Sequence, residues 1–164
     1  MKYLVLDSNI VIDYINADET LFSLVSQYVG EVCFVDKMLE EVAELRARSN
    51  ITELGINLIQ AETSEIVEAR NLGRKGRLSS YDWLCLIVTR RLKYCCVTND
   101  KGLINQCQAE GIETIRGGRL IVELCRQGGV TKTRAVEIVN EIATLNPHGS
   151  NAWLAELVAE IEKL

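Results

Sequence analysis

The chain has 164 residues, of which 48% are apolar and 25% charged, the balance of one ordinary globular domain. Its net charge of −5 argues against a protein that holds nucleic acid by general electrostatic attraction, although an acidic, metal-binding nuclease is compatible with it. The longest apolar run, Trp83 to Val88, is too short to span a bilayer, and no export signal opens the chain. We therefore expect a cytoplasmic protein with no membrane partner.

Short apolar runs alternate with longer helical patterns along most of the chain. The predicted strands are Tyr3–Leu6, Val32–Val35, Ile56–Gln60, Tyr94–Val97 and Ile112–Ile115. The predicted helices are one that begins at Ile10–Ile15 and others over about Lys37–Arg48, Ser64–Leu72, Ser80–Leu92 and Lys101–Ala109. This alternation is typical of an α/β domain with a mainly parallel central sheet.

The helix predicted at Ser80–Leu92 has a centre, WLCLIV, that is apolar on all sides and should be buried. A glycine-rich basic loop, NLGRKGR, precedes it. Three more helices follow the last strand: Arg119–Arg126, Lys132–Leu145 and Asn151–Lys163. These last helices predict a helical C-terminal region after the α/β pattern ends.

The six cysteines include no C-x-x-C pair, and most of them lie inside apolar runs. A zinc site would need paired, spaced thiolates with histidine or further cysteine nearby. We therefore expect buried, reduced thiols that behave as small apolar side chains.

Two acids stand at the ends of predicted strands. Asp7 directly follows the first strand, and Asp100 follows the fourth after two polar residues. Ligands of an open parallel sheet bind beyond the carboxyl ends of its strands, so these two carboxylates share one crevice if their strands are neighbours. Aspartate is also a good helix cap, and capping alone would explain either residue taken singly.

Asp82 opens the helix with the apolar centre. Ser79-x-x-Asp82 fits a capping box with aspartate in place of glutamate. Because this helix is the most apolar one, its first turn should place the Asp82 carboxylate toward the interior. A carboxylate in that position needs a partner, and a metal ion is one candidate.

The predicted helix Lys37–Arg48 carries three glutamates. Its apolar residues define one face at helical spacing, and Glu41 lies on the edge of that face. Glu40 and Glu44 project away from it, where solvated side chains are expected. Glu41 is therefore the glutamate predicted to turn inward.

Four acids are thus predicted to converge: Asp7, Glu41, Asp82 and Asp100. Clustered carboxylates repel one another and hold protons unless a cation neutralises them. Ligands that are all oxygens suit Mg²⁺ or Mn²⁺ rather than zinc. Such a site would suit two-metal hydrolysis of a phosphodiester.

Four segments resemble, in order, the motifs of the PIN-domain ribonucleases: YLVLDSNIVID, EEV, LSSYDWLCLIVTRRL and CCVTNDKGL. The resemblance covers roughly residues 1–126 as a PIN-like catalytic domain and leaves 127–164 as a C-terminal helical extension packed on or next to it. It implies a three-layer α/β/α sandwich and Mg²⁺- or Mn²⁺-dependent cleavage of single-stranded RNA. It further implies metal-binding, catalytic roles for Asp7, Glu41, Asp82 and Asp100, and supporting roles for Asn9 and Thr98.

The basic loop and the family suggest what the protein binds. Arg74, Lys75 and Arg77 precede the Asp82 helix and are expected to guide RNA phosphates toward the site. The family includes toxins of bacterial and archaeal toxin–antitoxin pairs, so an antitoxin is a candidate partner. A homodimer is also expected, with residues 132–164 serving dimerisation, partner binding or core cover.

Several alternatives stay open. A phosphatase of the HAD type or a response-regulator receiver also places acids at strand ends around Mg²⁺, but the phosphatase needs D-x-D where this chain has Asp7-Ser8-Asn9. A catalytically silent module that binds nucleic acid or protein is a second alternative, with the acids as caps and surface charge. Histidine-based hydrolysis has only His148 to use, and no phosphate-binding G-x-x-x-x-G-K-[ST] loop is present.

Overall fold

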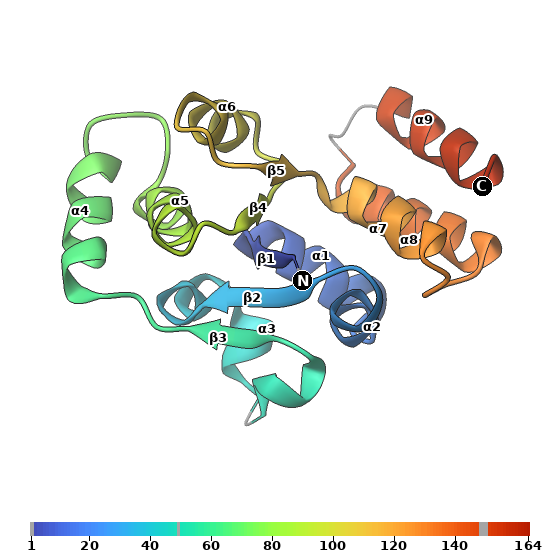
Figure 1. Cartoon of the computed structure of the whole chain (residues 1–164), viewed down its shortest axis with the longest axis horizontal. Coiled ribbons are helices and arrows are strands. Elements are labelled where there is room, and N and C mark those ends of the chain that lie inside the picture. The colour runs from blue at the N-terminus through green and yellow to red at the C-terminus, as the bar shows by residue number, and fades with distance from the viewer. Residues whose placement is uncertain (1, 49, 148–150) are drawn as a thin grey trace.

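The computed structural model describes residues 2–48, 50–147 and 151–164. Within them, five parallel strands form one sheet in the order β3-β2-β1-β4-β5 (Figure 1). The strands are β1 (Tyr3–Leu6), β2 (Glu31–Val35), β3 (Asn57–Ile59), β4 (Cys95–Val97) and β5 (Thr114–Ile115). The predicted parallel α/β class is confirmed, and β1 lies in the middle of the sheet beside β4.

Helices connect the strands and extend the chain beyond β5. They are α1 (Ser8–Asp18), α2 (Leu21–Tyr28), α3 (Ala43–Arg46), α4 (Thr63–Gly73), α5 (Ser80–Leu92), α6 (Lys101–Ala109), α7 (Gly117–Arg126), α8 (Lys132–Leu145) and α9 (Asn151–Glu162). Two short 3₁₀ helices, η1 (Asp36–Glu41) and η2 (Ile51–Leu54), lie between β2 and β3. Within the described residues, no helix is both long and apolar enough to cross a membrane.

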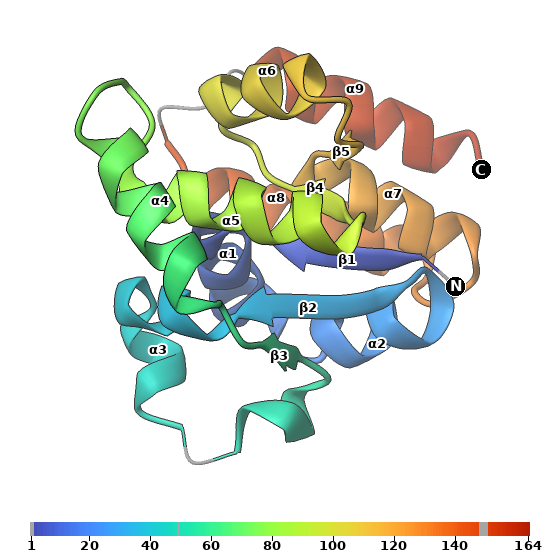
Figure 2. The same ribbon diagram turned by 60° about the vertical axis from the view of Figure 1, so that its left-hand side comes forward.

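Helices cover both faces of the sheet, which makes the three-layer α/β/α sandwich that was predicted (Figure 2). α4, α5 and α6 lie on one side. α1, α2 and α7 lie on the other, where the Tyr14 hydroxyl of α1 donates a hydrogen bond to the Gly117 carbonyl at the start of α7 over 2.7 Å. α8 packs on α1 and α7, and α9 packs on α7 and α8.

One apolar core runs from the sheet to the last helix. Val5 of β1 and Leu86 of α5 are fully buried, and Ile138 of α8 and Ile161 of α9 belong to the same cluster. The predicted division between residues 126 and 127 falls between α7 and α8, two helices that contact each other. α8 and α9 therefore complete the core. All six cysteines are buried and form no disulfide.

The prediction of one continuous helix over Lys37–Arg48 is wrong. The chain forms η1 and then the single turn of α3, and the two are separated at Val42, whose φ of −118° and ψ of 86° are not helical. A β-branched residue tolerates this extended backbone well. Asp36 is the first residue of η1, and its Oδ1 accepts hydrogen bonds from Lys37 N (2.7 Å) and Ala61 N (3.1 Å).

Smaller differences between the predicted and the observed elements concern where helices and strands end and where a helix is interrupted. The helix that was predicted to begin at Ile10–Ile15 is followed by a second one, α2, after a break where Asp18 Oδ1 accepts hydrogen bonds from Thr20 N and Thr20 Oγ1. β3 and β5 are shorter than the predicted runs because they are edge strands with one pairing partner each. The NLGRKGR loop begins later than predicted, since its first three residues complete α4.

Candidate active site

Asp7 stands where β1 ends and α1 begins. Its backbone N donates a hydrogen bond to the Val97 carbonyl of β4 over 2.9 Å, so the two strand ends are joined at this point. The residue is 4% exposed. Its Oδ1 accepts from Ser8 N at 2.8 Å and its Oδ2 accepts from Thr98 Oγ1 at 2.9 Å. Asp7 is therefore both the N-cap of α1 and a fixed, buried carboxylate beside β4.

The charge of Asp7 is disfavoured by its surroundings. Burial is the main cause that raises the pKa of its carboxyl from 3.8 to about 6, and repulsion from Asp82 and Glu41 adds to it. The hydrogen bonds from Thr98 and Ser8 act in the opposite direction. Asp7, Glu41 and Asp82 thus lie close enough to influence one another.

Glu41 is the last residue of η1 and reaches the site through Ser8. Its Oε2 accepts a hydrogen bond from Ser8 Oγ over 2.6 Å. Burial raises the pKa of Glu41, with a further contribution from Asp82, while the Ser8 hydrogen bond lowers it. The adjacent Glu40 has different partners, the Tyr81 hydroxyl and Lys37 Nζ. The structure thus places Glu41 by a 3₁₀ turn, whereas a helix face was expected.

Asp82 lies in the first turn of α5, and the predicted capping box is present. Ser79 N donates to Asp82 Oδ2 over 2.9 Å, and Asp82 N donates to Ser79 Oγ over 3.1 Å. The side chain is half-buried. Its charge raises the pKa of both Asp7 and Glu41. Asp82 therefore completes the capping box of α5, and its charge acts on the other two acids.

Asp100 is the N-cap of α6 and is exposed. Its Oδ1 accepts from Leu103 N over 2.7 Å, and its backbone N donates to Thr98 Oγ1 over 3.1 Å. The same hydroxyl donates to Asp7, and Thr98 is fully buried. Thr98 consequently links Asp7 to Asp100 at the end of β4.

The remaining predicted residues lie on the surface. Asn9 is exposed on α1, next to Ser8. Arg74, Lys75 and Arg77 are exposed in the segment between α4 and α5. Throughout the described chain, none of these three cations forms an ion pair with an acid. His148 lies outside the described residues.

The donor chemistry of the acids suits a hard divalent cation. Asp7, Glu41, Asp82 and Asp100 form no ion pair with any basic side chain of residues 2–48, 50–147 and 151–164. Carboxylate oxygens are the ligands that Mg²⁺ and Mn²⁺ prefer. In the described part of the chain, however, no three or more His, Cys, Asp or Glu side chains are already arranged to hold a metal ion. The four acids have the donor atoms and the charge that suit a divalent cation, but in the described chain they are not yet arranged as a complete coordination site.

Ser8 and Tyr81 are the residues that sequence reasoning missed. Ser8 donates from N to Asp7 and from Oγ to Glu41. Tyr81 precedes Asp82 and donates to Glu40. The only local signal for them was adjacency to a candidate acid, which does not say where a hydroxyl points.

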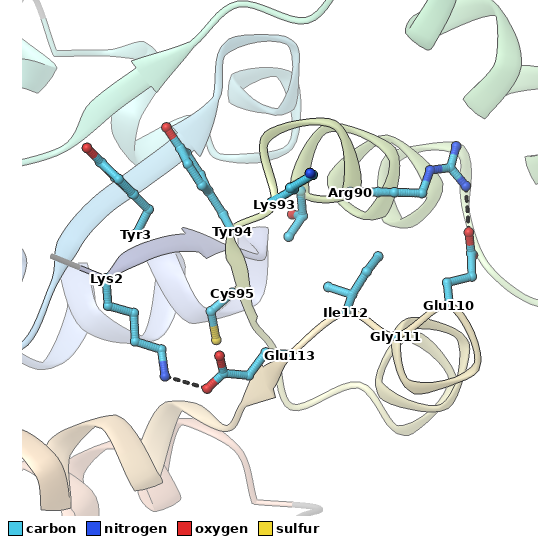
Figure 3. Close-up of a pocket in the computed structure, with 11 residues that line it drawn as sticks. Lys2, Tyr3, Arg90, Lys93, Tyr94, Cys95, Glu110, Gly111, Ile112 and Glu113 are labelled. Carbon is cyan, nitrogen blue, oxygen red and sulfur yellow. Dashed lines mark hydrogen bonds and ion pairs between the residues drawn. The ribbon is translucent and has the colours of Figure 1, made fainter.

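A hollow of about 490 Å³ lies at the opposite, amino end of β1 and β4 (Figure 3). Two ion pairs, Lys2–Glu113 and Arg90–Glu110, cross its lining, each with an N–O distance of 2.5 Å. None of the four acids lines it. This hollow is therefore separate from the candidate active site.

Comparison with known proteins identifies the fold. No protein-family model matches the chain, and no curated protein matches it. Among solved structures, it is similar to a PilT N-terminus domain protein from the hyperthermophilic archaeon Sulfolobus solfataricus. The TM-score is 0.50 at 12% identity, over 74% of this chain and 92% of that chain. At this identity, the likeness concerns the arrangement of the backbone.

Proposed function

We propose, from the PilT N-terminus (PIN) fold and its acidic site, that this protein is a Mg²⁺- or Mn²⁺-dependent endoribonuclease acting on single-stranded RNA. One observation carries the proposal. Asp7, Glu41 and Asp82 come from three separate segments and have no basic partner in the described chain, and burial, with a smaller contribution from neighbouring acids, raises the pKa of Asp7 and Glu41. Like charges held together in this way repel one another, and a cation or anion-neutralising substrate contact would relieve that repulsion.

The metal-binding set that we propose is Asp7, Glu41, Asp82 and Asp100. A divalent cation held there would supply activation of water and stabilisation of the leaving oxygen. The chain prepares Asp7 for this role, because Ser8 N and Thr98 Oγ1 fix its two oxygens. With a pKa of about 6, Asp7 is mostly ionised at neutral pH and available as a ligand.

The RNA contacts that we propose come from unpaired cations near the acids. Arg74, Lys75 and Arg77 are exposed just before the helix of Asp82. Lys101 follows Asp100 and, like Arg46 of α3, forms no ion pair within the described residues. Neutralisation of phosphates by such side chains would offset the overall net charge of −5 locally. Asn9, exposed beside Ser8, is placed to contact a phosphate or orient a ligand.

The test is cleavage of a labelled single-stranded RNA by purified protein with Mn²⁺, with Mg²⁺ and with EDTA. We expect cleavage that depends on either metal and is lost in Asp7→Asn. Glu44→Gln is the matched control, since Glu44 is exposed on α3 and unpaired in the described chain. Cleavage that survives EDTA, or that Asp7→Asn retains, would reject the proposal.

A catalytically silent RNA- or protein-binding module is the second candidate. It is favoured by a specific observation: Asp7 and Asp100 are helix N-caps, and Asp82 completes the capping box of α5. If capping is their whole role, RNA binding should persist in EDTA and no cleavage should appear with either metal. Binding and cleavage assays on the same preparation separate the two candidates.

We also propose a cytoplasmic location, a homodimer and an antitoxin partner. All six cysteines are buried and form no disulfide, which suits a reducing compartment. The dimer and the antitoxin rest on the resemblance to PIN-domain toxins. Light scattering of the purified protein tests the dimer, and growth arrest on expression, relieved by co-expression of a neighbouring gene, tests the toxin role.

A further inference from the structure

A pair of side chains joins the residues that immediately precede Glu41 and Asp82. The Tyr81 hydroxyl donates a hydrogen bond to Glu40 Oε2 over 2.5 Å. The other oxygen, Glu40 Oε1, lies 2.6 Å from Lys37 Nζ. Tyr81 is in the first turn of α5, and Glu40 is in η1, 41 residues earlier in the chain. We call the hydrogen-bonded pair the Tyr81–Glu40 clamp.

The clamp acts where the backbone offers little support. η1 is a short 3₁₀ helix that ends at Glu41, and the backbone leaves helical geometry at Val42. Glu41 itself is exposed and has one described hydrogen bond, from Ser8 Oγ. Its position is therefore fixed from two sides, by Ser8 through its own carboxylate and by Tyr81 through the neighbouring residue.

The clamp is the one side-chain hydrogen bond between η1 and α5 among the described residues. Glu41 and Asp82 directly follow the two clamp residues, and neither forms an ion pair with a basic side chain of the described chain. Two carboxylates on adjacent segments repel each other, and a hydrogen bond between the segments opposes their separation.

We infer that Tyr81 and Glu40 are positioning residues, which hold Glu41 within reach of Asp82 so that one divalent cation can bind to both. The inference rests on the proposed function for the identity of the ligand. The link between η1 and α5 is a matter of geometry and can be measured without metal or substrate.

The test uses Tyr81→Phe, which removes only the hydroxyl. Tyr28→Phe is the matched control, because Tyr28 is 40% exposed on α2 and its hydroxyl has no hydrogen bond within the described residues. The first readout is the hydrogen-exchange rate of the Val42 backbone amide, which donates to the Leu39 carbonyl at the end of η1, in the metal-free protein. The second is the Mn²⁺ concentration at half-saturation, from Mn²⁺-induced thermal stabilisation.

We expect the Val42 amide to exchange faster in Tyr81→Phe, because the end of η1 would open more often without its link to α5. Half-saturation should need about 10-fold more Mn²⁺, the effect of losing a group that orients a metal ligand. Glu40→Ala should do the same, and the double variant should add little, since both changes break one link. Tyr28→Phe should leave both readouts at wild-type values.

The outcomes separate the inference from the proposed function. If Tyr81→Phe matches Tyr28→Phe in both readouts, the clamp is overturned. If the wild type neither binds Mn²⁺ nor cleaves RNA, the proposed function fails, and the exchange rate of the Val42 amide alone decides whether the clamp holds η1 against α5. Circular dichroism of each variant shows that the fold is retained.

Discussion

Ser8 Oγ lies 2.6 Å from Glu41 Oε2, and this hydrogen bond joins the start of α1 to the end of η1, 33 residues later. The backbone N of the same serine donates to Asp7 Oδ1 over 2.8 Å. One small, buried residue thus orients two of the candidate metal ligands. A hydroxyl that orients a ligand is expected to matter for affinity, although it never contacts the ion itself.

Ser8→Ala should therefore weaken metal binding. Without the hydroxyl, Glu41 loses its described anchor on α1, and we expect a 10- to 100-fold rise in the Mn²⁺ concentration at half-saturation, as is usual for such groups. Mn²⁺-dependent thermal shifts measure it. Ser64→Ala, at an exposed position of α4, is the control and should bind like the wild type. Equal binding by both variants would remove Ser8 from the site.

Removal of one ligand charge should cost most of the activity. Asp7→Asn, Asp82→Asn, Asp100→Asn and Glu41→Gln are each expected to lower Mg²⁺-dependent RNA cleavage by about 100-fold or more, because a bound cation supplies several kcal/mol of transition-state stabilisation. Initial rates at saturating metal measure the loss. Glu44→Gln is the control for the glutamate, since Glu40 takes part in the clamp. Full activity of Glu41→Gln would exclude Glu41.

The stability of the metal-free protein should depend on pH through Asp7. Burial raises its pKa from 3.8 to about 6, so the stability that this carboxyl contributes is present below 3.8 and is lost as the pH rises through about 6. Asp7→Asn removes that loss. Relative to the wild type, the variant should gain on the order of 2 kcal/mol between about pH 4 and about pH 8 in EDTA.

Urea unfolding of both proteins at the two pH values measures this gain. Asparagine replaces one acceptor by a donor, which shifts the comparison by a similar amount at both pH values and cancels in the difference. Ser64→Ala, which changes no titratable group at an exposed position of α4, is the control and should show no such change with pH. If the effect of Asp7→Asn is the same at both pH values, the fold does not disfavour the ionised form of Asp7.

The basic segment between α4 and α5 should set the salt dependence of RNA binding. Changing Arg74, Lys75 and Arg77 to glutamine should weaken binding and reduce the slope of log K against log salt by about 2, the loss of three contacts to single-stranded RNA. Fluorescence anisotropy across a salt series measures both. The control is Lys93, Lys132 and Lys163 changed to glutamine, which lowers the net charge equally elsewhere. Equal effects of the two triples would mean that only net charge matters.

The C-terminal helices should be needed for stability. Ile138 of α8 is fully buried in the common core, and Ile138→Ala should lower the free energy of unfolding by about 2–5 kcal/mol through lost transfer energy and the cavity left behind. Val136→Ala, on the half-buried side of the same helix, should cost clearly less. Urea unfolding measures both. Similar small losses would indicate that α8 is only loosely attached to the domain.

The candidate site shows where sequence patterns stop being informative. Capping boxes and strand ends are local, so Asp7, Asp82 and Asp100 could be placed at the starts of helices from neighbouring residues alone. Glu41 was singled out on a helix that does not exist, and it reaches the site by a 3₁₀ turn instead. Ser8 and Tyr81 could not be found, because their partners are 33 and 41 residues away.

The sequence by itself determined the alternation of strands and helices, the parallel sheet and the burial of α5, since these follow from the period and length of apolar runs. Only the tertiary structure decided the break at Val42, the contact of η1 with α1 and α5, and the inclusion of α8 in the common core. Each of these depends on hydrogen bonds or packing between segments far apart in the chain. Such contacts outweigh the weak local preference of a few residues for helix, and no local pattern records them.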